Sequence, residues 1–172
     1  MSSVGPRGAV HPMSRPIAGL VGWVCVVAVV AAVGAFASLD ADLFYCALSR
    51  PAWAPAASLF GPVWTVLYLL MAIAAWRVWL RAGFAEARLE LSLFLAQLVL
   101  NGAWTWLFFS LHKGLWAFTE IVILWVCIAA VTALFARRDR LAGALLLPYL
   151  AWVTFAAFLN FSLWQRNPSI LS

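Results

Sequence analysis

Tryptophan and amide side chains lie well inside the apolar stretches of this 172-residue chain, where they could recognise a ligand. Trp104 follows Gln97 and Asn101 at helical spacing, so the three side chains share one helix face. An amide in hydrocarbon is costly unless it is hydrogen-bonded, so this face should turn toward the interior of a helix bundle. A belt of tryptophans at the ends of the stretches would indicate only a membrane protein. The pattern seen here predicts an aromatic-walled cavity that suits a flat, mostly apolar ligand.

Stripes with the same periodicity occur in three other apolar stretches. They comprise Trp64, Tyr68, Met71 and Ala75 in one, Trp116, Glu120, Ile123 and Cys127 in another, and Tyr149, Trp152, Ala156 and Leu159 or Asn160 in the last. The alternative role of the amides is to join helices, each hydrogen bond contributing about 0.6–2 kcal/mol. That role does not require four helices each to turn a tryptophan toward a common axis, so a shared cavity is the favoured interpretation.

The composition indicates an integral membrane protein of the all-α class. Hydrophobic residues make up 66% of the chain and charged residues 10%, whereas a soluble domain carries roughly 25% charged residues. A helix that crosses a bilayer needs about 20 apolar residues, and the alternation typical of barrel strands is not seen. We expect one bundle of five transmembrane helices, at about 17–38, 58–80, 89–111, 114–136 and 141–164.

Three regions are predicted along the chain, with a disordered leader at 1–16, the membrane domain at 17–167 and a short tail at 168–172. The leader and the connections at 81–88 and 137–140 should share one side of the membrane. With Arg77 at a helix end, that side holds eight basic residues, against Arg50, Lys113 and Arg166 on the other. The bias predicts a cytoplasmic N-terminus and an outside C-terminus, in a bacterial cell membrane.

Several functional classes lack support in the sequence. The three cysteines and two histidines show no metal-ligand spacing, so no metal and no cofactor are expected. The net charge of +5 is mostly topogenic, and no basic surface for nucleic acid is visible. Paired carboxylates, a Ser/His/Asp grouping and a phosphate-cradling glycine loop are also lacking.

The first connection, Leu39–Ala57, is long and rich in proline and aromatic residues, among them Tyr45 and Trp53. Loops of this length without regular structure are often lids or binding elements. We expect a stiff segment that caps the mouth of the bundle. The alternative is a loop adsorbed at the membrane interface, where tryptophan and tyrosine are common.

Several segments of the chain resemble the TspO/translocator protein family, the tryptophan-rich sensory proteins also called peripheral benzodiazepine receptors. The segments are YCALSRPAWAP at 45–55, FGPVWTVLY at 60–68, QLVLNGAW at 97–104 with a Phe-Phe pair at 108–109, and PYLAWVTFA at 148–156 followed by Leu159-Asn160. They lie in the family's order on the expected helices, and the resemblance runs from about residue 17 to 167.

The resemblance implies a five-helix bundle, often a homodimer, whose cavity is capped by the first loop. It implies porphyrins and haem precursors as ligands, together with isoquinoline carboxamide or benzodiazepine-type drugs and, in some members, sterols. Trp64 and Trp152 match the tryptophans linked to light-dependent porphyrin breakdown in bacterial relatives. Other positions expected at the ligand site, from the resemblance or from the stripes above, are Tyr45, Trp53, Tyr68, Gln97, Asn101, Trp104, Trp116, Phe155 and Ala156.

Two departures from the family pattern matter for these expectations. The loop has Pro55-Ala56 where the family commonly has two consecutive prolines, which predicts a less rigid lid. The segment LNFSLWQR at 159–166 lacks the tyrosine of the family's sterol motif, which leaves sterol binding doubtful.

Three functions remain open from the sequence. They are a membrane receptor or sensor for porphyrin-like ligands, an enzyme that degrades protoporphyrin under light through Trp64 and Trp152, and a transporter or regulator that moves tetrapyrroles or lipids. Aromatic stacking explains affinity in all three, and only the enzyme requires tryptophan chemistry. We favour the receptor.

Overall fold

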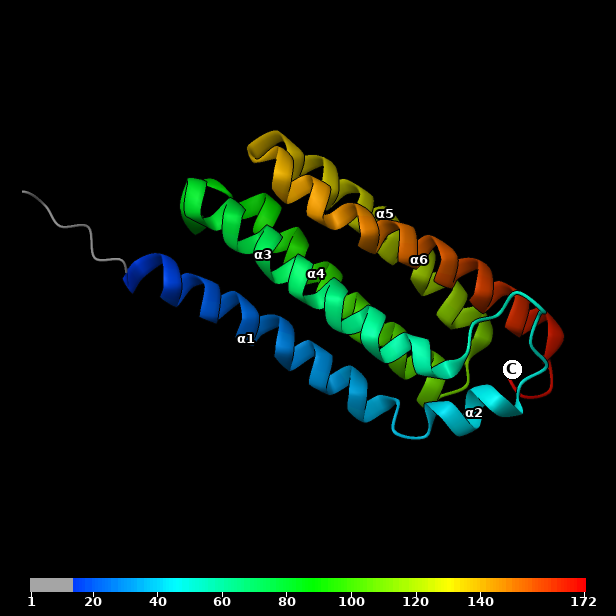
Figure 1. The fold of residues 1–172 in the computed structure, drawn as a ribbon. Helices are drawn as coiled ribbons and strands as arrows, with labels where there is room; N and C mark the ends of the chain where they lie inside the picture. The colour runs from blue at the N-terminus through cyan, green and yellow to red at the C-terminus, as the bar shows by residue number, and fades with distance from the viewer. Residues whose placement is uncertain (1–13) are drawn as a thin grey trace, which may run out of the picture.

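The computed structural model describes residues 14–172, and five long helices dominate this part of the chain (Figure 1). All five are apolar and long enough to cross a bilayer. The helices are α1 (Ser14–Ala37), α3 (Phe60–Glu86), α4 (Arg88–Thr105), α5 (Gly114–Arg138) and α6 (Arg140–Arg166). The predicted five-helix membrane bundle is thereby confirmed, while most of the predicted leader lies outside the described residues.

The long helices close into a ring around a common core. Going around the ring, α1 packs against α3, α3 against α6, α6 against α5, α5 against α4, and α4 against α1. The α5–α6 pair is the most extensive of these contacts, and the two helices run side by side in Figure 1. Their approach is close because Gly143 of α6 lies directly against Ala136 of α5. Small residues let two helices pack closely in lipid. Close packing matters there because the hydrophobic effect does not drive helices together in a bilayer.

The core is apolar, and so is much of the outer surface. Phe94 and Phe135 are fully buried and stacked with ring centroids 5.7 Å apart. Large apolar side chains are exposed along the outside of the bundle, including Val29, Val99 and Phe158. A water-soluble protein does not expose apolar side chains over such an area. The chain is therefore an integral membrane protein.

Two connections at one end of the bundle are shorter than the sequence analysis expected. The predicted 81–88 connection is mostly helical, because α3 extends to Glu86 with a break in helical geometry at Gly83, and only Ala87 separates it from α4. The helix turns within this extension at Gly83, whose φ of 65° is readily adopted only by glycine. Likewise, only Asp139 separates α5 from α6.

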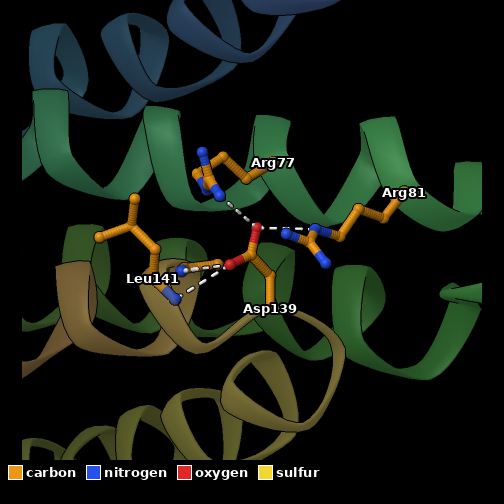
Figure 2. Close-up of polar contacts among 5 residues, drawn as sticks. Arg77, Arg81, Asp139 and Leu141 are labelled. Atoms are coloured by element: carbon orange, nitrogen blue, oxygen red, sulfur yellow. Dashed lines mark hydrogen bonds and ion pairs between the residues drawn. The ribbon is translucent and has the colours of Figure 1, made fainter.

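Asp139 fixes this end of the bundle (Figure 2). Its Oδ1 accepts the backbone N–H groups of Leu141 at 2.9 Å and Ala142 at 3.4 Å, which caps α6. Its Oδ2 lies 2.7 Å from Arg77 Nη2 and 2.9 Å from Arg81 Nε, both on α3. Burial by itself would raise the pKa of this carboxyl, but the two N–H donors and then the two guanidinium groups outweigh it and hold the pKa below its usual range.

The opposite end of the bundle carries the first loop, residues 38–59. It contains a short helix, α2 (Ala41–Ala47), and a 3₁₀ turn, η1 (Ala57–Leu59), which the sequence analysis had not anticipated. In Figure 1 the loop lies beside the C-terminus, at the end of the bundle where α3 begins and α6 ends. The first loop caps the cavity described next.

Candidate functional site

A cavity of about 440 Å³ lies beneath the first loop, between α1, α3, α4 and α6. Of the predicted site residues, the structure brings six together in its wall, namely Tyr45, Trp64, Tyr68, Trp104, Trp152 and Ala156. Asp42 of α2 is the one charged residue that the described part of the chain contributes to this wall. The cavity is therefore mostly apolar and aromatic, with a few polar groups, as small-molecule sites commonly are.

Aromatic pairs build the wall on both sides. On α3, Trp64 and Tyr68 are one helical turn apart and their ring centroids lie 5.4 Å from each other. On α6, Trp152 meets Phe60 edge to face at 5.9 Å. Trp104 and Phe108 stack nearly parallel, with an interplanar angle of 10°. These contacts hold the rings in place before any ligand binds.

Asn160 orients Trp104 within the wall. The indole Nε1–H of Trp104 donates to Asn160 Oδ1 at 3.0 Å, and Asn160 Nδ2 donates to the carbonyl of Gly114 at 3.3 Å. Asn160 lines the cavity and was only an alternative at its position in the sequence analysis. The signal that could have selected it is its amide, which needs a buried partner in an otherwise apolar helix.

Gln97 and Asn101 are buried in the bundle interior but do not line the cavity. They form a hydrogen-bonded network behind its wall. Tyr68 donates to Asn101 Oδ1 at 2.7 Å, Asn101 Nδ2 donates to the Tyr149 hydroxyl at 3.2 Å, and that hydroxyl donates to Gln97 Oε1 at 2.9 Å. The amides thus act as the joining groups that the sequence analysis had weighed, and they position Tyr68, the member of the network that reaches the cavity.

A π-helical turn, η2 (Trp106–Ser110), follows α4 and supplies two further rings to the wall. The wide turn is closed by the N–H of Leu111, which donates to the carbonyl of Trp106 at 2.9 Å. Phe108 and Phe109, which are consecutive residues of this turn, both line the cavity. Neither phenylalanine was among the predicted site residues, although the pair belongs to the segments that resemble the family.

The small residues that α1 presents to the cavity were also absent from the predicted site. Ala31, Gly34 and Ala35 of α1 line it at helical spacing. Their spacing was visible in the sequence, but small residues pack helices more often than they line ligand sites.

Tyr45 brings the first loop into the wall. Its ring is 2% exposed, lies edge to face with Phe60, and its hydroxyl donates to the carbonyl of Pro55 at 3.1 Å. Burial raises the pKa of the Tyr45 hydroxyl, against the opposing effect of the nearby Arg50 guanidinium. That guanidinium lies over the ring, 5.0 Å from its centroid.

Besides Gln97 and Asn101, three of the predicted residues lie away from the cavity wall. Trp53 is half-exposed on the first loop and meets Phe155 edge to face at 5.9 Å. Phe155 faces a shallow groove on the membrane side of α3 and α6. Trp116 is 65% exposed on the outer face of α5. The stripe that α5 buries is Ala117, Ile121, Leu124 and Ile128, one residue out of register with the expected stripe.

Comparison with known proteins agrees with this architecture. The sequence profile of the TspO/MBR family matches residues 23–165. The chain is 40% identical over 135 residues to the tryptophan-rich protein TspO of Chlorobaculum tepidum, covering 77% of this chain and 85% of that protein. It is 36% identical over 149 residues to the tryptophan-rich sensory protein of Cereibacter sphaeroides, covering 84% and 92%. It is 37% identical over 126 residues to the human translocator protein, covering 72% and 75%. Five apolar spans and a matching profile over most of its length show that this chain belongs to the TspO/MBR family.

Proposed function

We propose that this protein is a membrane receptor or sensor that binds porphyrins, such as protoporphyrin IX and other haem precursors, in the cavity beneath the first loop. The observation that carries the proposal is that Trp64 and Trp152 line the same cavity of about 440 Å³, whose wall is mostly apolar and aromatic. Flat π-systems bury well against indole rings. Flat synthetic ligands of the isoquinoline carboxamide or benzodiazepine type suit the same site for the same reason.

Titration of the purified protein with protoporphyrin IX in darkness tests this function. Trp152→Ala should weaken binding roughly tenfold to a hundredfold, because it removes stacking area worth about 1–3 kcal/mol. Trp116→Ala is the matched control, since it deletes the same side chain from the outer face of α5. Equal affinity in the wild type and in the alanine and phenylalanine variants of both Trp64 and Trp152 would refute the shared site.

Illumination separates a receptor from an enzyme. If porphyrin is degraded through indole oxidation, Trp64→Phe and Trp152→Phe should keep most of the affinity and lose most of the light-dependent decay of porphyrin absorbance. If affinity and decay fall together, or decay continues at the wild-type rate at full occupancy, the indoles serve as walls. We place the protein with the receptors, and Trp64 and Trp152 are catalytic residues only under the first outcome.

A transporter or regulator of tetrapyrrole or lipid movement is the second candidate. It is favoured by the exposed residues Ala35 of α1 and Gly61 and Thr65 of α3, which line the cavity and leave it open between these helices. Such an opening would let a ligand exchange with the bilayer. Protein-dependent flux of protoporphyrin across proteoliposomes would favour this candidate over the receptor.

The proposed setting is a bacterial cell membrane with the N-terminus in the cytoplasm and the C-terminus outside. The basic residues support this orientation, since Arg77, Arg81, Arg88, Arg137, Arg138 and Arg140 gather at one end of the bundle.

Homodimerisation through α4 is also proposed, with α1 as the competing surface. The exposed face of α4 includes Ser92, Ala96 and Val99, and small residues allow close helix contact in lipid. Disulfide crosslinking between cysteines placed along α4 and along α1 distinguishes the two surfaces, and a protein that stays monomeric in nanodiscs contradicts both.

A further inference from the structure

The first loop is tied to the C-terminal end of the chain by Asn167, and we propose that this contact holds the loop closed over the cavity and so sets how fast ligands exchange with water. Asn167 is then a positioning residue for the ligand site, although it does not line the cavity. The part that concerns ligand exchange rests on the proposed binding function, whereas the part that concerns loop closure does not.

The contact between Asn167 and Ser49 is reciprocal. Asn167 Oδ1 accepts the backbone N–H of Ser49 at 2.8 Å, and Asn167 Nδ2 donates to the carbonyl of Ser49 at 3.1 Å. The second Nδ2 hydrogen is also used, because this nitrogen donates to the carbonyl of Leu163 at 2.8 Å. The side chain is 6% exposed, so water does not offer an easy replacement for these bonds. Only an amide both donates and accepts in this way.

The tail that follows Asn167 packs beneath the loop. The N–H groups of Ile170 and Leu171 donate to the carbonyl of Asn167, which folds the tail into a turn. Leu171 is fully buried in an apolar cluster with Tyr45 and Leu48 of the first loop. Its place depends on Gly114, where an added Cβ would lie 2.9 Å from Leu171 Cβ. Ile170, the neighbouring residue, is 43% exposed.

The contact acts directly on the cavity wall. Ser49 follows Leu48, and one helical turn earlier Tyr45 lines the cavity. After Ser49 along the chain, the Arg50 guanidinium lies over the Tyr45 ring, and the carbonyl of Pro55 accepts a hydrogen bond from the Tyr45 hydroxyl. Releasing Ser49 from Asn167 therefore frees the segment that holds Tyr45 in the cavity wall. A residue that only capped α6 would need the bond to Leu163 and neither bond to Ser49.

Thiol labelling tests loop closure without any ligand. The three native cysteines are replaced by serine, and Ala156→Cys places a single thiol in the cavity wall. Reaction with a charged, membrane-impermeant thiosulfonate then reports access from water. Asn167→Ala should accelerate labelling about tenfold, which corresponds to a shift of about 1.4 kcal/mol toward the open loop. Leu171→Ala should accelerate it as well, and Ile170→Ala should leave it unchanged.

Equal labelling rates in the wild type, Asn167→Ala and Leu171→Ala would overturn the proposal. If Asn167→Ala does not fold, Asn167→Asp keeps the proposal testable, because its carboxylate still accepts the Ser49 N–H but can no longer donate to the Ser49 carbonyl. It should also accelerate labelling, and an unchanged rate would overturn the proposal. Equal acceleration by Ile170→Ala would also overturn it, since the effect would then belong to the tail in general.

Stopped-flow binding of protoporphyrin IX tests ligand exchange. In Asn167→Ala the association and dissociation rates should both rise about tenfold, while Kd changes by less than about threefold. The reason is that the first loop must open both for binding and for release, and the variant makes this opening easier. Accelerated labelling with unchanged binding rates would overturn the control of exchange. If the wild type does not bind protoporphyrin, the proposed function fails, and the labelling rates alone decide whether Asn167 holds the loop.

Discussion

Asp139 joins three helices through one carboxylate, since it lies between α5 and α6 and pairs with two arginines of α3. Arg81 is more than half exposed, so solvent weakens its part of the interaction, whereas Arg77 is mostly buried. The single residue between α5 and α6 therefore also provides the ionic contacts that join this turn to α3.

Asp139→Asn keeps the oxygen that caps α6 and removes the charge. We expect a loss of about 1–3 kcal/mol in the free energy of unfolding near pH 7. The folded pKa of Asp139 is lowered, so its contribution is fully present above its unfolded pKa of about 3.9 and disappears as pH falls through the folded value. Thermal unfolding in detergent between pH 7 and pH 2 should show a difference between wild type and variant that is constant down to about pH 4 and narrows below it. A difference that is constant across this range contradicts the assignment.

The Tyr149 hydroxyl joins two buried amides in the interior of the bundle. Tyr149→Phe removes the hydroxyl that bridges Asn101 and Gln97 but keeps the buried ring. In membrane proteins such hydrogen bonds contribute about 0.6 kcal/mol on average, so the variant should lose about 1–2 kcal/mol of stability.

Porphyrin affinity should not change in Tyr149→Phe, because Tyr149 is not part of the cavity wall. Tyr68→Phe is the comparison, since it loses a bond of the same network at a residue that lines the cavity. The two effects are measured by thermal unfolding and by titration, and a large loss of affinity in Tyr149→Phe would show that the network shapes the cavity.

At the scale of the elements, periodicity predicted the helices better than it predicted their faces. Long uninterrupted apolar runs placed all five long helices, because a helix that crosses the hydrocarbon needs about 20 apolar residues. The face of α5 was displaced by one residue, since Ala117 and Ile121 pack inward where Trp116 and Glu120 had been expected. Almost every residue of such a helix is apolar, so lipid and core cannot be distinguished by hydropathy. The first loop was predicted as a cap, but α2 was too short to leave a helical signal.

Gly143 lies at the point where α6 packs most closely against α5. An added Cβ at this position would lie 2.5 Å from Ala136 Cβ and 2.8 Å from its Cα. Gly143→Ala should therefore push α6 away from α5 and cost about 1–3 kcal/mol. At Gly22 of α1, an added Cβ would meet nothing within 4 Å. Gly22→Ala should not lower stability, because alanine favours a helix over glycine by up to about 1 kcal/mol, and equal melting temperatures for the two variants would contradict the close packing of α5 on α6.

For the whole molecule, the two ends of the bundle differ in charge and in whether a loop covers them. One end carries the arginines of short connections, and the other carries the first loop and the C-terminus (Figure 1). The sequence predicted this asymmetry from residue counts alone. It could not predict that the loop is tied to the C-terminus, because the hydrogen bonds between Ser49 and Asn167 join residues 118 positions apart.

The proposed orientation can be checked in intact bacteria. An impermeant thiol reagent should label Cys46, which is exposed on the first loop, without permeabilisation. A cysteine introduced at the exposed Ala85, near the arginine-rich end, should be labelled only after the membrane is opened. The reverse pattern would place the N-terminus outside.

The π-helical turn at Trp106–Ser110 makes the cavity depend on chain length as well as on residue type. An α-helix and a π-helix differ by one residue per closed turn, so the turn behaves as a tolerated one-residue insertion. Deleting Leu107 would shorten the turn by one residue and rotate Phe108 and Phe109 relative to α4. Substitution at Phe108 or Phe109 changes one ring, whereas this deletion changes the direction in which both point. A relative could therefore keep every aromatic residue of the wall and still lose its shape through a single missing codon.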